Sequence, residues 1–286
     1  MNAALAMLKL LFHPKKNRAS EVYDLLSTAN NLGENSLYLN LGYWDGATTY
    51  DGAAQALAEQ LGLAAGRAAG DQVLDCGFGF GDQDLYWAKR FALKRLVGLN
   101  ITASQVAVAR KRVEAAGAAA VVDLREGSAT AMPFRGPEFD KVLALETAFH
   151  YDTRWDFFRE AFRVLKPGGR LATADIIPLG PRDSWVDKAG DYLGRSFWQI
   201  PKENMATEQE YANKLRDAGF DGVRIVSIRE LVYAPFARYA KKRLEEPEIK
   251  ARMSLLVRGF FKASMPEFEC GNSLDYIIAV AEKPHA

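Results

Sequence analysis

The segment VLDCGFGFGDQD, residues 73–84, decides the fold class of this chain. It begins as an apolar strand, places Gly77, Gly79 and Gly81 at alternate positions, and continues into a helix that Asp82 is expected to cap. Glycines let a backbone turn tightly and approach a ligand, and the N–H groups at a helix start attract an anion. The spacing GxGxG differs from the dinucleotide pattern GxGxxG, because Asp82 stands where that pattern has its last glycine. The segment predicts a site for a nucleotide-type ligand.

Apolar runs of strand length alternate with helical periodicity along the rest of the chain. The expected strands lie at residues 72–76, 95–100, 120–126, 139–146, 170–177, 222–230 and 274–283. The expected helices lie at residues 102–117, 152–169 and 208–220. In the helix at 152–169, one stripe is formed by Trp155, Phe158, Phe162 and Leu165. This alternation predicts an α/β domain with a parallel sheet and crossover helices.

Composition excludes several classes of function. The chain has 286 residues, of which 49% are hydrophobic, so it can bury a sizeable core. Lys and Arg number 37 against 36 Asp and Glu, and this balance gives no field that would gather nucleic acid. Two cysteines, Cys76 and Cys270, are too few for a disulfide framework, so a reducing cytoplasm is expected. The apolar run at residues 1–12 is too short to span a bilayer; it is interpreted as a packed helix or a weak membrane-surface contact.

Two stretches do not fit a minimal doubly wound sheet. Residues 181–204 carry four large aromatic residues, which are Trp185, Tyr192, Phe197 and Trp198. In residues 231–271, Pro235 is expected to open a helix that Pro247 interrupts. A stripe then follows at spacings of four, three and four, formed by Ile249, Met253, Leu256 and Phe260. Two interpretations stay open: ordinary packing, or the wall and lid of an apolar substrate pocket.

Five motifs in order resemble the class I S-adenosylmethionine-dependent methyltransferases of the small-molecule type. They are DCGFGFG, GLNIT, GSATAMPF, LETAFHY and LKPGGRL, all within residues 72–178. Upstream, residues 36–46 are similar to the cofactor-covering segment of sterol, tocopherol and sugar O-methyltransferases, and the last strand is similar to the family's antiparallel seventh strand. The resemblance implies a doubly wound, mostly parallel seven-stranded sheet with helical lid insertions at 181–204 and 231–271. It also implies an N-terminal helical cap at 1–66 and a core at 67–286.

The same resemblance implies which residues hold S-adenosylmethionine. Asp75 to Gly81 would lie against the methionine part, and Asn100, followed by Ile101, stands where many members carry an acid for the ribose hydroxyls. Ser128, followed by Ala129, stands where the family often has an aspartate for the adenine. An amide and a hydroxyl keep hydrogen-bond capacity without the charge. The remaining candidates are Gln105, Glu146, and the aromatic residues Tyr38, Tyr43 and Trp44, whose faces favour a cation.

His150 is the candidate catalytic residue. The segment ETAFHY, residues 146–151, follows the fourth strand, at the sheet edge where ligands bind in open α/β folds. Glu146 and His150 match the Glu, three residues, His spacing of the relatives, whose histidine serves as the base for hydroxyl acceptors. A neutral imidazole, with an ordinary pKa of about 6.5, accepts a proton near neutral pH. The competing interpretation is that His150 caps or packs under the following helix, and Tyr151 is an alternative proton-transfer residue.

These observations predict a cytoplasmic enzyme that transfers a methyl group from S-adenosylmethionine to a small, apolar acceptor, at an oxygen atom. The residues expected to contact the acceptor are Trp44, His150, Trp185, Trp198 and Phe236, and no metal is expected. Alternatives are carbon methylation of an isoprenoid or other lipid, and a non-catalytic module that binds the cofactor. An NAD-dependent oxidoreductase is disfavoured by the missing last glycine of the turn.

Overall fold

The fold is taken from a computed structural model. It describes residues 29–66, 68–180, 200–270 and 273–285. The predictions for residues 1–12, and for Trp185 and Trp198 as acceptor contacts, lie outside the described residues.

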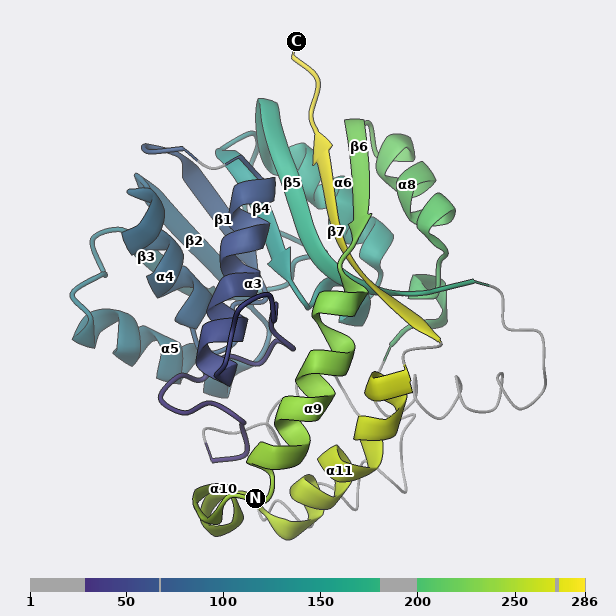
Figure 1. The fold of residues 1–286 in the computed structure, drawn as a ribbon. Coiled ribbons are helices and arrows are strands. Elements are labelled where there is room, and N and C mark those ends of the chain that lie inside the picture. The colour runs from purple at the N-terminus through teal and green to yellow at the C-terminus, as the bar shows by residue number, and fades with distance from the viewer. Residues whose placement is uncertain (1–28, 67, 181–199, 271–272, 286) are drawn as a thin grey trace.

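Seven strands form one sheet in the order β3-β2-β1-β4-β5-β7-β6 (Figure 1). Their bounds are β1 Gln72–Cys76, β2 Arg95–Asn100, β3 Val122–Glu126, β4 Phe139–Leu145, β5 Leu165–Pro178, β6 Asp221–Ser227 and β7 Leu274–Glu282. The pairs β1–β2, β1–β4, β2–β3 and β4–β5 are parallel, whereas β7 is antiparallel to both β5 and β6. This topology confirms the predicted doubly wound sheet with an antiparallel last strand.

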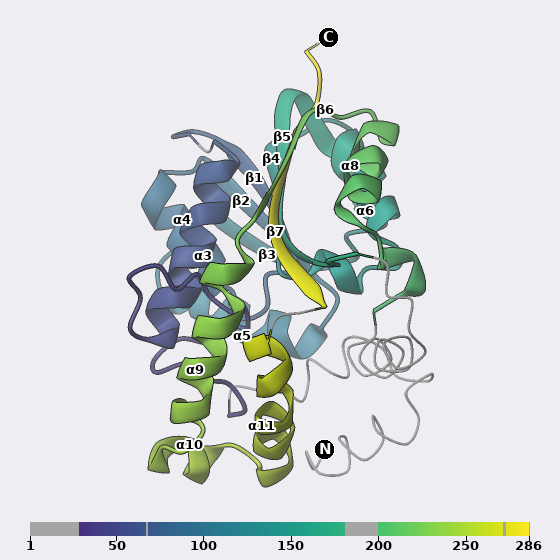
Figure 2. The same ribbon diagram turned by 45° about the vertical axis from the view of Figure 1, so that its right-hand side comes forward.

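Helices cover both faces of the sheet, so the fold has three layers. Figure 2 shows α3 and α4 on one side and α6 and α8 on the other. The bounds are α3 Tyr50–Ala64, α4 Asp82–Phe91, α5 Ala103–Ala115, α6 Arg154–Val164 and α8 Glu208–Asp217. The cores follow this division: α3, α4 and α5 contribute to one buried cluster, and α6 and α8 to the other. The predicted boundary between cap and core near residue 66 stays a prediction.

The helix predicted at 152–169 is too long by several residues. It ends at Val164, because Leu165 has extended backbone angles (φ −71°, ψ 139°) and pairs with Phe139 as the first residue of β5. Pro167, with no backbone N–H, is compatible with this extended path and not with a helix interior. Leu165 is buried, as its stripe predicted, but it belongs to the strand.

The prediction that Asp82 caps α4 is wrong. The cap position is Gly81, whose left-handed backbone (φ 83°) suits a residue without a Cβ atom. Asp82 is the first helical residue, and its carboxylate accepts from the Arg112 Nη2 at 2.7 Å and from the Leu37 backbone N–H at 3.2 Å. The side chain therefore fastens the segment before α3 to the glycine turn.

The stretch between β6 and β7 forms three α-helices beyond the carboxyl ends of the parallel strands (Figure 1). They are α9 Tyr233–Arg243, α10 Pro247–Arg252 and α11 Leu255–Cys270. Pro235 lies two residues inside α9 rather than at its start. The predicted stripe is also broken, because Met253 is extended (φ −84°, ψ 133°) and Leu256 in the next helix is 46% exposed.

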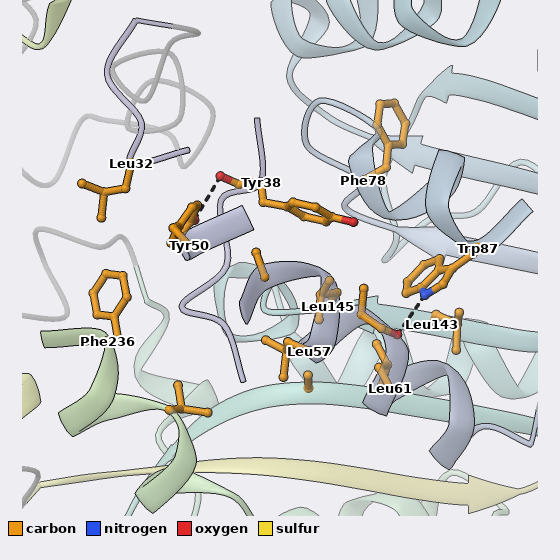
Figure 3. Close-up of a cluster of buried hydrophobic side chains, with 14 of the residues drawn as sticks. Leu32, Tyr38, Tyr50, Leu57, Leu61, Phe78, Trp87, Leu143, Leu145 and Phe236 are labelled. Atoms are coloured by element: carbon orange, nitrogen blue, oxygen red, sulfur yellow. Dashed lines mark hydrogen bonds between the residues drawn. The ribbon is translucent and has the colours of Figure 1, made fainter. Parts of the chain in front are cut away.

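An aromatic and aliphatic cluster joins the segment before α3 to the sheet and to α9. Figure 3 shows Tyr38 projecting from that segment toward Phe78 and Trp87, with Phe236 of α9 on the opposite side of Tyr50. The Tyr50 hydroxyl donates to the backbone oxygen of Tyr38 at 3.1 Å, and the Trp87 Nε1 donates to that of Ala58 at 2.9 Å. Hydrogen bonds thus satisfy the Tyr50 hydroxyl and the Trp87 Nε1, which this apolar cluster buries.

A buried ion pair fixes α6 to the sheet. Arg154, at the start of α6, and Asp175, in β5, are both fully buried, and the Arg154 Nε lies 2.9 Å from the Asp175 Oδ2. The Tyr211 hydroxyl of α8 also donates to that oxygen at 3.0 Å. Removing one partner would leave the other charge buried without compensation, which is far more costly than losing an exposed pair.

Across the described ranges, none of the helices has the length and apolarity needed to cross a membrane. The same ranges contain no group of three or more His, Cys, Asp or Glu side chains arranged to hold a metal ion.

We predict that Arg154→Met lowers the free energy of unfolding by about 3–5 kcal/mol, because the Asp175 carboxylate loses its buried counter-charge. Urea unfolding followed by circular dichroism measures this. Arg159→Met on the same helix breaks a pair whose arginine is 65% exposed, and should cost less than about 1 kcal/mol. Equal losses in the two variants would contradict the assignment.

Candidate active site

A cavity of about 1010 Å³, open to solvent, lies at the carboxyl ends of β1, β2 and β4. We call it the first cavity. Its wall contains residues 77–80 of the glycine turn, 99–102 at the end of β2, 127–130 after β3 and 145–147 at the end of β4. Residues 37–40 form a further part of the wall. Segments far apart in the sequence meet here because parallel strands place their carboxyl ends at one edge of the sheet.

The glycine turn depends on one close approach, at Gly77, and on a left-handed backbone at both Gly77 and Gly79. Gly77 has φ +94°, and a Cβ atom there would lie 2.3 Å from the Thr147 Oγ1. Gly79 has φ +56° and lines the cavity, so a side chain at this position would strain the backbone at the wall. Gly81 and Asp75 do not line the cavity. Asp75 is fully buried beneath the turn, where the Gln83 Nε2 donates to its Oδ2 at 3.1 Å.

Asn100 is bonded to the protein through both ends of its amide. Its Nδ2 donates to the Gln105 Oε1 at 2.9 Å and to the Gly79 oxygen at 3.4 Å, and its Oδ1 accepts from the Thr102 N–H at 3.2 Å. Gln105 is 3% exposed, lines the cavity, and its Nε2 has no hydrogen-bond partner among the described residues. A buried donor of this kind fits a ligand hydroxyl, so Gln105 is better placed than Asn100 to supply a new bond.

The segments after β2 and β3 supply the predicted adenine side of the cavity. Ile101 is 52% exposed and lines the wall, where an apolar side chain suits the face of a ring. Ser128 and Ala129 lie in the same wall. The Ser128 Oγ accepts from the Thr130 N–H at 3.2 Å, so its position is fixed by its own turn.

Of the three aromatic residues expected to reach the cavity from the predicted covering segment, only Tyr38 does so. Tyr38 lines the first cavity, as do its neighbours from Leu37 to Asn40. Tyr43 and Trp44 are not in the wall of this cavity or of the second cavity described below. The Trp44 ring lies 4.9 Å from the Tyr239 ring of α9, and its Nε1 donates to the Leu41 oxygen at 2.8 Å. Tyr43 and Trp44 both pack against the buried core, so they connect this segment to the core and do not line either cavity.

Glu146 lies between two cavities and binds the covering segment. Its Oε2 accepts from the Leu41 N–H at 2.8 Å and from the Tyr276 hydroxyl of β7 at 2.7 Å. Burial raises the pKa of the carboxyl group to about 7, although both hydrogen bonds act in the opposite direction. Its backbone φ of +53° is unusual for a residue with a side chain, and it directly follows the last residue of β4.

His150 and Tyr151 follow in the short 3₁₀ helix η2, Ala148–His150, and both line the first cavity. Thr153 caps α6 through its own side chain, so His150 is not the cap of that helix. The Tyr151 hydroxyl donates to the Cys76 oxygen at 2.7 Å, and burial raises the pKa of this hydroxyl well above its ordinary value. Tyr151 thus anchors the loop to β1, and the suggestion that it transfers protons is not supported.

A second cavity of about 940 Å³ adjoins the first and shares with it Tyr38, Leu39, Asn40 and Glu146. Aromatic side chains dominate its far wall: Phe149, Phe236, Phe260, Phe261 and Phe268. Phe236 was predicted as an acceptor contact, whereas the α11 phenylalanines were missed apart from Phe260, which the sequence placed on a packing stripe. The sequence held a signal for them: Phe261 and Phe260 lie seven and eight residues before Phe268, and both spacings place side chains on the same face of a helix.

The doubly wound sheet, the glycine turn and the cavity at the strand ends define an α/β enzyme that binds a nucleotide-type cofactor. Residues 74–173 match the family described as "Methyltransferase domain". The chain is 40% identical over 280 residues to erythromycin 3''-O-methyltransferase of Saccharopolyspora erythraea, covering 94% of this chain and 91% of the relative. The chain belongs to the class I S-adenosylmethionine-dependent methyltransferases, transfers methyl groups to small molecules, and uses S-adenosylmethionine as methyl donor.

Two further relatives extend this comparison. The 27-O-demethylrifamycin SV methyltransferase of Amycolatopsis mediterranei is 29% identical over 281 residues, covering 95% of this chain and 98% of the relative. A solved structure of geranyl diphosphate C-methyltransferase from Streptomyces coelicolor A3(2), in complex with Mg²⁺, geranyl-S-thiolodiphosphate and S-adenosyl-L-homocysteine, superposes with a TM-score of 0.68 at 19% identity. It covers 94% of this chain and 99% of that chain, and at this identity it supports the fold alone.

We predict that Gln105→Ala weakens S-adenosylhomocysteine binding about tenfold, because one hydrogen bond from a buried donor is lost. Titration calorimetry measures the dissociation constant. Gln209→Ala, at an exposed position on α8, is the matched control and should bind as the unaltered protein does. Unchanged binding by Gln105→Ala would remove Gln105 from the cofactor contacts.

The raised pKa of Glu146 predicts a pH-dependent stability. Between pH 4.5 and about 7, the folded protein keeps a proton that the unfolded chain has released, so the free energy of unfolding falls as pH rises through this window. Glu146→Gln removes this titration and keeps an oxygen acceptor. As the pH rises from 4.5 to about 7, the free energy of unfolding of the variant should increase by up to about 3 kcal/mol relative to that of the unaltered protein. Urea unfolding without ligand measures this difference. A difference that does not change with pH would refute the assignment.

Proposed function

We propose that this enzyme methylates a hydroxyl oxygen of a large, mostly apolar natural product, and that His150 accepts the hydroxyl proton. The observation that carries the proposal is the position of His150 in the wall of the first cavity, after β4, next to a second cavity lined by aromatic residues. The names of the two O-methyltransferase relatives, which act on erythromycin and on 27-O-demethylrifamycin SV, support oxygen as the acceptor atom.

Methyl transfer to a hydroxyl requires the protein to orient the methyl donor and to accept the hydroxyl proton. S-adenosylmethionine, when bound, supplies a methyl group on a positively charged sulfur. The residues of the first cavity hold and orient that cofactor; we assign this role to the glycine turn, Gln105, and the residues after β2 and β3. His150 then accepts the proton of the hydroxyl as the oxygen bonds to the methyl carbon and the carbon–sulfur bond breaks. General base catalysis of this kind is worth about a hundred- to ten-thousandfold in rate.

The second cavity is proposed as the acceptor site. Phe236, from the predicted list, and the aromatic residues of α11 would contact apolar parts of the acceptor, and residues 37–40 and Glu146 would separate it from the cofactor. Among the described residues that line the two cavities, none is Lys or Arg. A diphosphate acceptor needs cationic or metal partners, so this lining favours an uncharged acceptor over a prenyl diphosphate methylated at carbon.

An acceptor panel tests the proposal. The purified enzyme and S-adenosylmethionine are incubated with erythromycin lacking its 3''-O-methyl group, with 27-O-demethylrifamycin SV, with geranyl diphosphate, and with a simple phenol. Product mass and fragmentation identify the methylated atom. Methylation at oxygen of one of the first two compounds supports the proposal. Methylation of geranyl diphosphate at carbon would replace it with the alternative function, and cofactor binding without turnover of any compound would favour a non-catalytic module.

We predict that His150→Ala lowers kcat for a hydroxyl acceptor by at least about a hundredfold, because the proton acceptor is removed. S-adenosylhomocysteine binding, measured by calorimetry, should stay unchanged. His285→Ala is the matched histidine control, since His285 is 82% exposed near the end of the chain. Turnover that survives in His150→Ala would return His150 to a packing role.

A further inference from the structure

Asn204 bonds to the backbone on both sides of His150. It ends the 3₁₀ helix η3, Lys202–Asn204, and its side chain is buried, with 1% exposure. Its Nδ2 donates to the backbone oxygen of Phe149 at 3.0 Å and to that of Tyr151 at 2.8 Å. These are the residues directly before and after His150. One amide nitrogen therefore spans the His150 position without touching the imidazole.

Asn204 is itself fixed to the sheet through Arg154. The Arg154 backbone N–H donates to the Asn204 Oδ1 at 2.8 Å, and the Arg154 Nη1 donates to the Asn204 backbone oxygen at 2.7 Å. Arg154 is held by the buried carboxylate of Asp175 in β5. A continuous set of bonds thus runs from β5, through α6, to both neighbours of His150.

The other hydrogen bonds described for this loop lie within the turn or reach β1. The His150 N–H donates to the Thr147 oxygen and the Tyr151 N–H to the Ala148 oxygen, and both bonds lie within the turn itself. The Tyr151 hydroxyl ties the far end of its side chain to β1. Asn204 connects the backbone on both sides of His150 to the start of α6.

We propose that Asn204 is a positioning residue for His150, setting the direction of the imidazole toward the acceptor hydroxyl. The inference rests on the proposed function, in which His150 receives a proton. Asn204 lines neither cavity, so it acts through the loop and not through either ligand. The amide is required because a carboxylate of the same shape has no N–H to donate to two carbonyl oxygens.

Kinetics give the first test. Asn204→Ala and the isosteric Asn204→Asp should each lower kcat about ten- to a hundredfold, the effect of a misplaced catalytic group, with S-adenosylhomocysteine binding unchanged. In a His150→Ala background, the same substitutions should change kcat by less than about twofold, because the residue through which they act is absent. An equal loss in both backgrounds, or full activity of the single variants, would overturn the inference.

The matched control separates positioning from stability. Thr173→Val removes a buried hydrogen bond between Thr173 and Tyr211, which belongs to the same network around Asp175 but does not include the backbone of η2. It should lower the unfolding temperature and leave kcat unchanged when measured well below that temperature. A kcat loss in Thr173→Val as large as in Asn204→Ala would assign the effect to general loosening and overturn the inference.

A measurement independent of catalysis keeps the test separate from the proposed function. The chain has three histidines, so ¹³C labelling of the imidazole ring gives three resonances, and His150→Ala identifies that of His150. Asn204→Ala should shift or broaden the His150 resonance and leave that of His285 in place. If His150→Ala retains turnover, the proposed base role fails, but a shifted resonance still supports positioning of the loop. An unchanged His150 resonance overturns the inference whatever the turnover.

Discussion

The carboxylate of Glu146 joins the parts of the molecule that must act together. It directly follows β4, accepts from the segment that covers the first cavity and from Tyr276 of the antiparallel strand β7, and lines both cavities. Such a carboxylate is stable in a buried position only while its donors stay in place. One acceptor oxygen therefore connects the covering segment, the last strand and the wall between the cavities.

The sequence predicted the sheet and the place of the first cavity because each depends on local signals. Alternating apolar runs located the strands, and the glycine turn marked the place where the backbone passes close to Thr147. Local signals also explain the errors. Asp82 precedes a helix and is a good cap by type, but Gly81 occupies the cap position and Asp82 binds Arg112, which is 30 residues away. The spacing of residues along the chain does not reveal a partner that lies so far away in the sequence.

The acceptor side was less predictable for a related reason. Tyr43 and Trp44 were expected at the cofactor on chemical grounds, but the segment turns at Gly42 (φ +80°), and Trp44 packs on α9. The stripe from Ile249 to Phe260 assumed one continuous helix, and the extended Met253 ends that continuity. Asn204 belongs to none of the motifs recognised in the sequence. Its importance comes from the meeting of η3, α6 and η2 in three dimensions.

The helices α9, α10 and α11 enter the chain between β6 and β7, which are neighbours in the sheet and antiparallel. Their side chains form much of the second cavity, whereas most of the first cavity is built from segments before β5. Substitutions or length changes in this one inserted stretch can alter the shape of the second cavity without changing the register of any parallel strand. With the second cavity as the proposed acceptor site, the fold allows the range of accepted compounds to diverge during evolution while the methyl donor stays the same.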